Sequence, residues 1–513
     1  MSSLLDLTDF AQVRAGFSRD RLWELFDGNR DTMNLAHECL DRHRGCGRAV
    51  SVVHADGELE HLDYTELAEA SSRFANWLEH RGVEAGERVA VILEPGRAFY
   101  TCLFGAIKRG AIAVPMFTLF GPEGLALRIR DCSPTLVITA DNATDLKRQF
   151  PALGIIEIGP AFDAELARCP HHYEAATQAD DLCVFQYTSG TTRELPEAVR
   201  HTQRSVVTLM IAALYGSGLR PGDRFFCPSS PAWGHGLWHG TIAPLALGLH
   251  VGAYAGRFDP LRLFAALEQL GTNNLAAAAT VYRLLKNSGA RDNYRIALEK
   301  CTFTGEPLDA HTFDWIADAF GVAPGSMYGT TEVGVIMVDY PGYRGHTVRR
   351  GALGKPAPGN EVAVLDAAGA PAAVREIGEI AVKRRDAWFR VKDFGWVDED
   401  GYFYHAGRAD DVIISAGWTM SAVEIENSLL QHAAVAEAAV IGVPDPLRGQ
   451  IARAYIVSRR GESATVADLQ HHLQSQLSRH EYPREIEFID ELPKTPAGKV
   501  NRKALRDRAA ARP

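Results

Sequence analysis

Short apolar runs that alternate with helical stretches constrain the fold of this chain more than any other feature. An apolar run without polar alternation is typical of a strand buried on both faces, and helices between such strands connect neighbours in a parallel sheet. The sequence therefore predicts an α/β fold with parallel-rich sheets flanked by helices. The apolar runs lie at residues 88–93, 112–115, 136–139, 182–185, 225–227 and 245–254, and the helical stretches at 64–81, 98–109, 205–214 and 261–270.

The pattern changes twice along the chain, which has 513 residues and is too long for a single core. Short strands separated by turns begin near residue 350 and predict a β-rich subdomain. A separate α+β pattern occupies the last stretch, with helices at 421–431 and 466–478 and strands at 434–442 and 452–457. We expect an N-terminal domain at 1–404, with the β-rich subdomain at about 350–404, a hinge at 405–411 and a small mobile α+β domain at 412–513.

Composition narrows the class of protein. The formal net charge of −10 argues against a nucleic-acid binder, which would carry a basic stripe. No apolar run reaches the ~18 residues of a membrane span, and residues 1–10 lack the basic start of a signal peptide. The eight cysteines form no CxxC pair, which argues against a zinc site or a disulfide framework. We expect a cytoplasmic enzyme with no membrane span and no nucleic-acid partner.

A loop rich in hydroxyl groups follows the apolar run at 182–185. After Tyr187 it carries Thr188, Ser189, Gly190, Thr191 and Thr192. Backbone N–H groups, hydroxyl donors and a glycine that permits close approach form a cradle for phosphate, especially where a helix follows. An ordinary polar turn would have the same composition, so the loop alone leaves both interpretations open.

Four stretches further along the chain add motifs in a fixed order. They are Thr304-Gly305-Glu306-Pro307-Leu308, Met327-Tyr328-Gly329-Thr330-Thr331-Glu332-Val333-Gly334, residues 388–411 and residues 492–502. Together with the loop after Tyr187, they make the chain resemble the adenylate-forming (acyl-activating, AMP-binding) superfamily over roughly residues 34–506. The sequence near Asn34, Trp233 and Tyr482 is most similar to acetyl-CoA synthetase and to the medium-chain acyl- and benzoate-CoA ligases.

The resemblance implies a two-step ligase reaction with ATP, Mg²⁺ and CoA. A carboxylate attacks the α-phosphorus of ATP to give acyl-AMP and pyrophosphate, and the CoA thiol then attacks the acyl carbon. The first step brings two anions together, so the site needs neutralised charge and fixed geometry. The expected substrate is a short- or medium-chain, cyclic or aromatic acid.

The resemblance also implies how the nucleotide is held. Glu332 would bind Mg²⁺, Thr331 would donate to the α-phosphate, and Asp393 would accept from both ribose hydroxyls. A helix-capping glutamate and an ordinary turn acid are the structural alternatives for Glu332 and Asp393. The residues expected to bind ATP or AMP are the five of the hydroxyl-rich loop with Gly305, Glu306, Pro307, Tyr328, Gly329, Thr330, Asp393 and Arg408.

Lys499 matches the catalytic lysine of the superfamily, which bridges the carboxylate and the α-phosphate, although a surface lysine alone is usually only solvated. Its place on a mobile domain implies domain alternation, with Asp410 as the hinge residue. After rotation, Gly417 and Trp418 would line the tunnel for the pantetheine arm of CoA.

Trp233 and His235 fall where the superfamily lines the acyl pocket. A large indole there would shorten the pocket and favour a small, cyclic or aromatic acid. Core packing of Trp233 is the structural alternative.

Three departures from the usual motifs remove cations or glycines. In the phosphate loop, Arg193 stands where glycine is usual, one residue is added, and Glu197 replaces the lysine. The usual Thr-Gly-Asp reads Val391-Lys392-Asp393, and Thr419 stands where an arginine is common. Arg193, Arg200 or Lys392 could compensate for the lost charge.

Two alternatives to a CoA ligase stay open from the sequence. A stand-alone adenylation enzyme would load its acyl group onto a carrier protein in trans. A non-catalytic nucleotide- or acyl-binding homologue would explain the missing loop lysine. Retention of Glu332, Asp393, Arg408 and Lys499 argues for activity.

Overall fold

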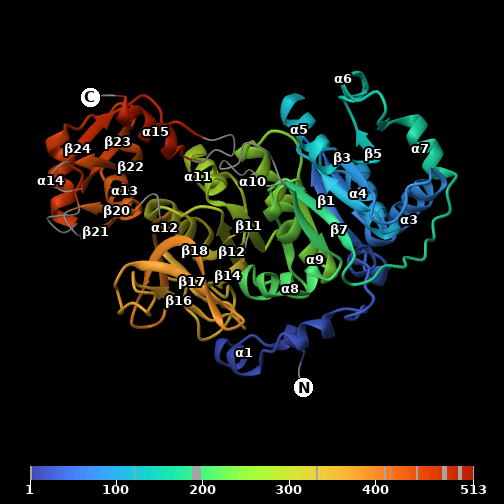
Figure 1. The fold of residues 1–513 in the computed structure, drawn as a ribbon, viewed down its shortest axis with the longest axis horizontal. Coiled ribbons are helices and arrows are strands. Elements are labelled where there is room, and N and C mark those ends of the chain that lie inside the picture. Colours follow the sequence, from blue (N-terminus) through green and yellow to red (C-terminus); the bar gives the residue numbers. More distant parts are fainter. Residues whose placement is uncertain are drawn as a thin grey trace.

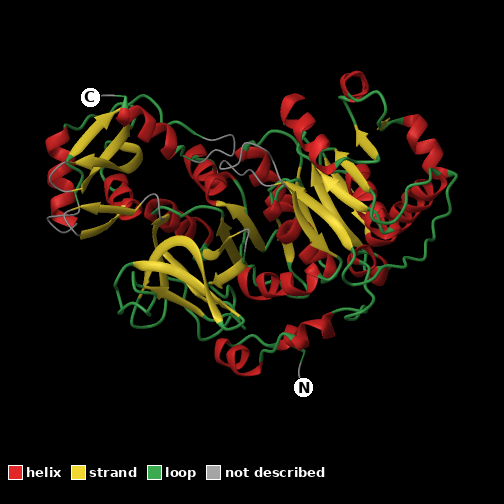
Figure 2. Cartoon of the chain, viewed as in Figure 1, coloured by secondary structure: helices red, strands yellow, loops and turns green. Residues whose placement is uncertain are grey.

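The computed structural model describes residues 3–118, 120, 122–187, 198–330, 333–408, 412–415, 418–445, 449–476, 482–494 and 500–511. In these residues the strands form three sheets, and helices flank them (Figure 1 and Figure 2). The predicted α/β class is therefore confirmed. Among the helices of this part of the chain, none combines the length and apolarity that crossing a membrane requires.

One sheet has six strands in the order β6-β5-β3-β4-β7-β8. The first five run parallel, and all residues of β4 and β5 are buried, as expected for strands with helices on both faces. Its strands are β3 (Arg88–Ile92), β4 (Ile112–Pro115), β5 (Leu136–Thr139), β6 (Gly154–Glu157), β7 (Leu182–Tyr187) and β8 (Ala198–Thr202), and the helices nearby in sequence are α3 (Tyr64–His80), α4 (Arg97–Arg109), α5 (Pro122–Cys132), α6 (Ala143–Gln149) and α7 (Pro160–Ala167).

β8 corrects one expectation. The hydroxyl-rich loop was expected to lead toward a helix start, but a strand comes first: β8 runs antiparallel to β7, with Tyr187 opposite Ala198. β8 covers the hydrogen-bonding edge that β7 would otherwise expose. The helix, α8 (Ser205–Ile211), begins only after β8 and continues into a π-helical turn, Ala212–Gly216. Two antiparallel strands therefore frame residues 188–197, which lie outside the described residues.

The largest sheet has thirteen strands in the order β16-β17-β18-β19-β15-β14-β13-β12-β11-β9-β10-β1-β2. The strands are β1 (Arg48–Val53), β2 (Leu59–Asp63), β9 (Arg224–Phe226), β10 (His250–Tyr254), β11 (Asn274–Ala278), β12 (Lys300–Thr304), β13 (Gly325–Thr330), β14 (Gly334–Val338), β15 (Ala352–Pro356), β16 (Val362–Leu365), β17 (Gly378–Arg384), β18 (Ala387–Val397) and β19 (Phe403–Arg408). Its helices are α9 (Ala243–Ala246), α10 (Pro260–Gln269), α11 (Ala279–Ser288) and α12 (Ala310–Phe320). The apolar run at 245–254 divides between α9 and β10.

The strands after residue 350 continue this sheet and also have their own core. β13 pairs in parallel with β12 on one side and antiparallel with β14 on the other, so it joins the parallel and antiparallel parts. Val364, Ile380, Val382 and Phe403 form a separate apolar cluster in the antiparallel part. The site residues described below come from the junction between the two parts.

The third sheet belongs to the C-terminal part, at one end of the molecule (Figure 1). Its order is β21-β20-β23-β22, with β24 parallel to β23. Ile425, Ile456 and Leu469 belong to a core of its own, as the expected α+β pattern requires. The elements are β20 (Val412–Ser415), β21 (Trp418–Ser421), β22 (Val435–Asp445), β23 (Gly449–Ser458), β24 (Glu485–Phe488), α13 (Ala422–Leu430), α14 (Val466–Gln476) and α15 (Arg502–Ala510).

An N-terminal strap, residues 4–25, crosses to the antiparallel part of the large sheet. It contains α1 (Phe10–Gly16), and α2 (Leu35–Cys39) follows it. The backbone N–H of Phe10 donates to the Arg344 carbonyl at 2.9 Å, and the Phe10 ring packs edge-on against Tyr340, with centroids 4.8 Å apart. Arg19 donates to the Gly359 carbonyl at 3.1 Å. Figure 1 shows α1 at the edge of the molecule below the antiparallel strands.

Candidate active site

Asp393 lies in an irregular part of β18, close to Tyr328 of β13. Oδ2 of Asp393 accepts a 2.5 Å hydrogen bond from the Tyr328 hydroxyl, and His405 Nε2 lies 4.0 Å from the same oxygen. Asp393 is 8% exposed, and its backbone is opposite that of Arg408 at the end of β19. The carboxylate is thus positioned by neighbouring strands and retains accessible surface.

The residue before Asp393 adopts a backbone conformation that favours glycine. Lys392 has φ = +65°, and its side chain is exposed. The usual motif has glycine at this position, so the sequence departure coincides with a left-handed residue. A non-glycine residue there carries a conformational cost of roughly 1–2 kcal/mol.

The end of β13 needs glycine for a different reason. A Cβ on Gly329 would lie 2.1 Å from the Gly334 carbonyl oxygen, so the two strands approach too closely for any side chain. The pairing of β13 with β14 shifts register between Tyr328 and Gly329, and the Thr330 hydroxyl beyond is buried with no hydrogen-bond partner among the described residues. Thr331 and Glu332 lie outside those residues.

The turn that follows β12 lies beside β13. The Thr304 hydroxyl donates to the Met327 carbonyl at 2.8 Å and ties the end of β12 to β13. Gly305 follows with φ = +90°. The structure therefore brings together Gly305, Tyr328 and Asp393, three residues that are separated widely in the sequence.

Arg283 of α11 holds this turn, and no sequence motif points to this residue. Its guanidinium donates to Glu306 Oε1 at 2.9 Å, to the Pro307 carbonyl at 2.9 Å and to Asp309 Oδ2 at 3.1 Å. The Thr280 hydroxyl also donates to Glu306 Oε1. The Glu306 carboxylate thus faces α11, which leaves the backbone of this turn as the surface that would meet a base.

Trp233 is half-buried, and its indole contacts Phe117 edge-on, with centroids 5.8 Å apart. His235 Nδ1 lies 2.9 Å from the Ser229 hydroxyl, and burial lowers the pKa of His235 to about 3. Burial likewise lowers the pKa of His239 to about 4. Both imidazoles are neutral at pH 7, so they add no charge near Trp233.

The remaining predicted residues are placed only in part. Arg408 ends β19 and Trp418 begins β21, which locates their backbones. The predictions that lie outside the described residues concern Thr188, Ser189, Gly190, Thr191, Thr192, Arg193, Glu197, Thr331, Glu332, Asp410, Gly417 and Lys499.

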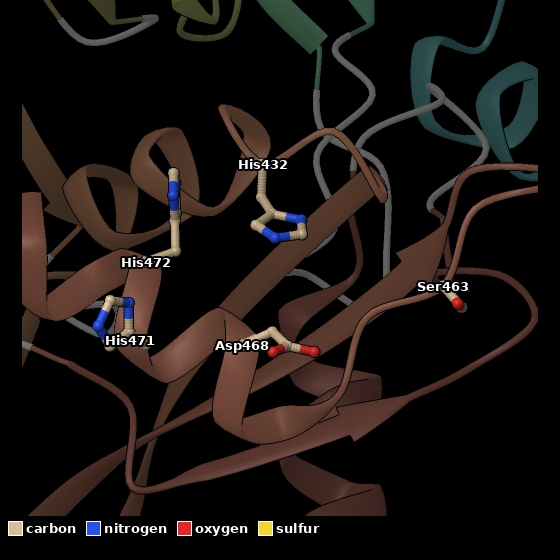
Figure 3. Close-up of a pocket in the computed structure, with 5 residues that line it drawn as sticks. All are labelled: His432, Ser463, Asp468, His471 and His472. Atoms are coloured by element: carbon tan, nitrogen blue, oxygen red, sulfur yellow. The ribbon is translucent and has the colours of Figure 1, made fainter.

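An open cavity of 450 Å³ lies in the C-terminal part. His432, Ser463, Asp468, His471 and His472 line it. Figure 3 shows that the three imidazoles point in different directions, and His472 Nε2 is already 2.9 Å from the Ser428 carbonyl. Within the described part of the chain, no group of three His, Cys, Asp or Glu side chains could hold a metal ion.

Comparison with known proteins assigns the family. A family model for the AMP-binding enzyme matches residues 41–388, and one for the AMP-binding enzyme C-terminal domain matches 424–499. The chain therefore belongs to the AMP-binding enzyme family. Within that family it is an AMP-forming acid–CoA ligase, as the sequence predicted.

Relatives match over nearly the whole chain. The acetyl-coenzyme A synthetase of Bacillus subtilis (strain 168) is 30% identical over 92% of this chain and 90% of its own length. The structure of a Brucella canis acyl-CoA synthetase is 32% identical, with a TM-score of 0.76 over 98% of this chain and 99% of that one. An anthranilate CoA ligase in complex with anthranoyl-AMP is 26% identical, with a TM-score of 0.84 over 96% of this chain and 100% of that one.

Proposed function

We propose that this ligase activates a small, cyclic or aromatic carboxylic acid in the cytoplasm. The carboxylate oxygen forms a bond to the α-phosphorus of ATP, and the bond to the β-phosphate oxygen breaks, which releases pyrophosphate. The thiol of CoA then loses its proton and forms a bond to the acyl carbon, and AMP leaves. Charge neutralisation and fixed geometry lower the barrier of the first step.

The meeting of Gly305, Tyr328 and Asp393 is the observation that supports this proposal most. Tyr328 presents an aromatic ring whose hydroxyl is already committed to Asp393, so the ring face is what it offers to adenine. The Asp393 carboxylate has further acceptor sites for a ribose diol. The backbone around Gly305, which Arg283 fixes through Glu306 and Pro307, would form the opposite wall for the base.

The roles of the remaining motif residues follow from the family resemblance. Lys499 would bridge the carboxylate and the α-phosphate, with Thr331 donating beside it. Glu332 would hold Mg²⁺, which supplies neutralising charge to the phosphates when bound. Asp410 would act as the hinge, and Gly417 and Trp418 would line the pantetheine tunnel.

The aromatic edge contact of Trp233 with Phe117 supports a compact acyl group. His235 and His239 are neutral, so these two imidazoles provide no countercharge for a second carboxylate. The relatives named for acetyl-CoA and anthranilate both take compact acids, in line with this proposal.

A screen of short, medium, cyclic and aryl acids for pyrophosphate release tests the proposal. Release that depends on a compact acid, with its acyl thioester formed on free CoA, supports it. Release without thioester on CoA would point instead to a carrier protein as acceptor. No acid-dependent release and no acid-dependent ATP–pyrophosphate exchange with any member of the panel would overturn the proposal.

A further inference from the structure

Arg128 of α5 is a half-buried cation between two aromatic rings. Its guanidinium carbon lies 3.8 Å from the centre of the Phe120 ring and 5.6 Å from that of Tyr187. Nη1 donates to the Gly124 carbonyl at 2.8 Å. Nε is buried with no partner among the described residues, and Nη2, also without one there, stays accessible. The side chain is therefore held in place with one donor group open.

No carboxylate in the described part of the chain pairs with this guanidinium. Asp131, one turn along α5, instead accepts a 2.6 Å hydrogen bond from the Tyr187 hydroxyl. Two of the other stacked arginines have acidic partners: Arg81 on Trp77 binds Glu165, and Arg349 on Tyr402 binds Asp398. Burial lowers the pKa of Arg128 below its usual value, yet the group stays charged at neutral pH. A partly desolvated charge without a countercharge is typical of a site for an anion.

The location of Arg128 suggests which anion. Tyr187 is the last residue of β7, and its hydroxyl lies 3.0 Å from the Arg128 carbonyl as well as bonding to Asp131, so α5 is fixed to the end of this strand. The neighbouring strand β4 leads into Phe117, whose ring contacts both Phe120 and Trp233. In open α/β sheets, ligands bind at the carboxyl ends of the strands. Arg128 is thus connected through Phe120 and Phe117 to Trp233 of the candidate acyl pocket, and it contacts Tyr187, the last described residue before the segment that the sequence predicts to contact phosphates.

We propose that Arg128 binds a phosphate group of the ATP polyphosphate and supplies the positive charge that the lysine replaced by Glu197 would provide. The accessible Nη2 would donate a charge-assisted hydrogen bond to a phosphate oxygen, while Phe120 and Tyr187 hold the guanidinium plane. This inference rests on the proposed function, because it needs an enzyme that binds ATP for adenylation. It adds a binding residue that the known motifs of this sequence do not contain.

The decisive measurement is the KM for ATP in acid-dependent ATP–pyrophosphate exchange. Arg128→Ala should raise it by about tenfold or more, the size expected for one charge-assisted hydrogen bond, and leave the KM for the acid nearly unchanged. Arg130→Ala is the matched control, because Arg130 is an exposed arginine on the same helix that stacks on Phe150. It should leave both constants unchanged. Arg128→Lys keeps the charge but not the planar fork, and it should give an intermediate KM for ATP.

A rescue experiment separates charge from packing. Glu197→Lys restores the usual lysine, so it should lower the KM for ATP strongly in the Arg128→Ala background and only weakly in the parent. If Glu197→Lys lowers the KM for ATP equally in the Arg128→Ala variant and in the parent, Arg128 does not compensate for the missing lysine. An Arg128→Ala enzyme with an unchanged KM for ATP, or with a raised KM for CoA alone, would overturn the ATP assignment. If the parent shows no exchange with any acid, the proposed function fails instead, and Arg128 is then not at issue.

Discussion

The Tyr328 hydroxyl donates a 2.5 Å hydrogen bond to Oδ2 of Asp393, which joins two residues that are 65 positions apart. One of them is expected to stack on adenine and the other to bind ribose. Because this bond joins the two side chains, the expected adenine site and the expected ribose site are held in a fixed relation to each other.

Asp393→Asn should reduce ATP–pyrophosphate exchange by about 100-fold, since it weakens two expected charge-assisted hydrogen bonds to ribose. Tyr328→Phe keeps the ring and removes the bond to Asp393, so a loss of about threefold to tenfold is expected. Tyr404→Phe is the control, because it removes a tyrosine–aspartate bond to Asp398 elsewhere in the same sheet. A loss in Tyr328→Phe as large as that in Asp393→Asn would mean that the phenol itself contacts the nucleotide.

Lys392→Gly should raise the midpoint of thermal unfolding. Lys392 has φ = +65°, which glycine adopts without strain, and the net gain should be about 0.5–1 kcal/mol after the greater entropy of glycine in the unfolded chain is counted. Lys392→Ala keeps the left-handed residue and should give no gain. If Lys392→Gly and Lys392→Ala have the same unfolding midpoint, relief of backbone strain at position 392 does not stabilise the protein. A raised KM for ATP in both would indicate that the lysine charge contributes to binding.

Arg283→Ala should raise the KM for ATP by about fivefold, because the turn with Gly305 loses the guanidinium that fixes Glu306 and Pro307. Lys286→Ala is the matched control on the same helix: its amine donates to Thr312 and lies 3.8 Å from Asp309, but it does not hold the turn. Steady-state kinetics at varied ATP would measure both. If the two variants behave alike, Arg283 has no special role in the turn.

Stability should fall as the pH drops from 6.5 toward 4. Burial lowers the pKa of His201, His239 and His250 to about 4 and that of His235 to about 3, against an ordinary value of 6.5. In this window the unfolded chain binds protons that the folded protein excludes. Each histidine therefore lowers the free energy of unfolding by up to about 1.4 kcal/mol for each pH unit of acidification. Above pH 6.5 the four histidines should add no pH dependence.

Thermal midpoints measured between pH 7.5 and 5 would check this window. His201→Phe should reduce the fall of the thermal midpoint at acid pH, since the ring contact with Trp238 can persist without a titrating group. Replacing the exposed His171 with glutamine should leave the curve unchanged. A His201→Phe curve parallel to that of the parent would contradict the assignment of this histidine.

Lys499→Ala should nearly abolish the formation of acyl-AMP while leaving thioester formation from supplied acyl-AMP largely intact. The lysine is expected to act only while charge builds at the α-phosphate. Single-turnover assays of the two half-reactions would measure this directly. Equal loss of both would refute the two-conformation account of catalysis.

Much of the fold could be predicted from the sequence because buried strands are apolar along their whole length. β4 and β5 are examples, and both appear where their apolar runs lie. β8 was missed because its residues include Arg200 and His201 and follow a polar loop, so only its pairing with β7 makes it a strand. Strand pairing between distant segments leaves no local periodicity to detect.

The site was predictable only where a motif carries it. Asp393, Tyr328 and Gly305 stand in recognisable motifs, and the structure brings them together. The Arg283 side chain contacts a residue 24 positions away and the Arg128 side chain contacts one 59 positions away, so nothing in their local sequence marks them. Lys392 is the intermediate case, because the absent glycine was visible in the sequence while its backbone conformation was not.

The N-terminal strap has a consequence for synthesis of the chain. Arg19 bonds to a carbonyl that lies 340 residues further along. At roughly 5–20 residues per second, the strap waits on the order of tens of seconds on the ribosome before its docking surface exists. During that time the apolar side chains of residues 4–25, Phe10 among them, are left without their final partners and are available to chaperones. Slower translation before residue 340 would lengthen this exposure.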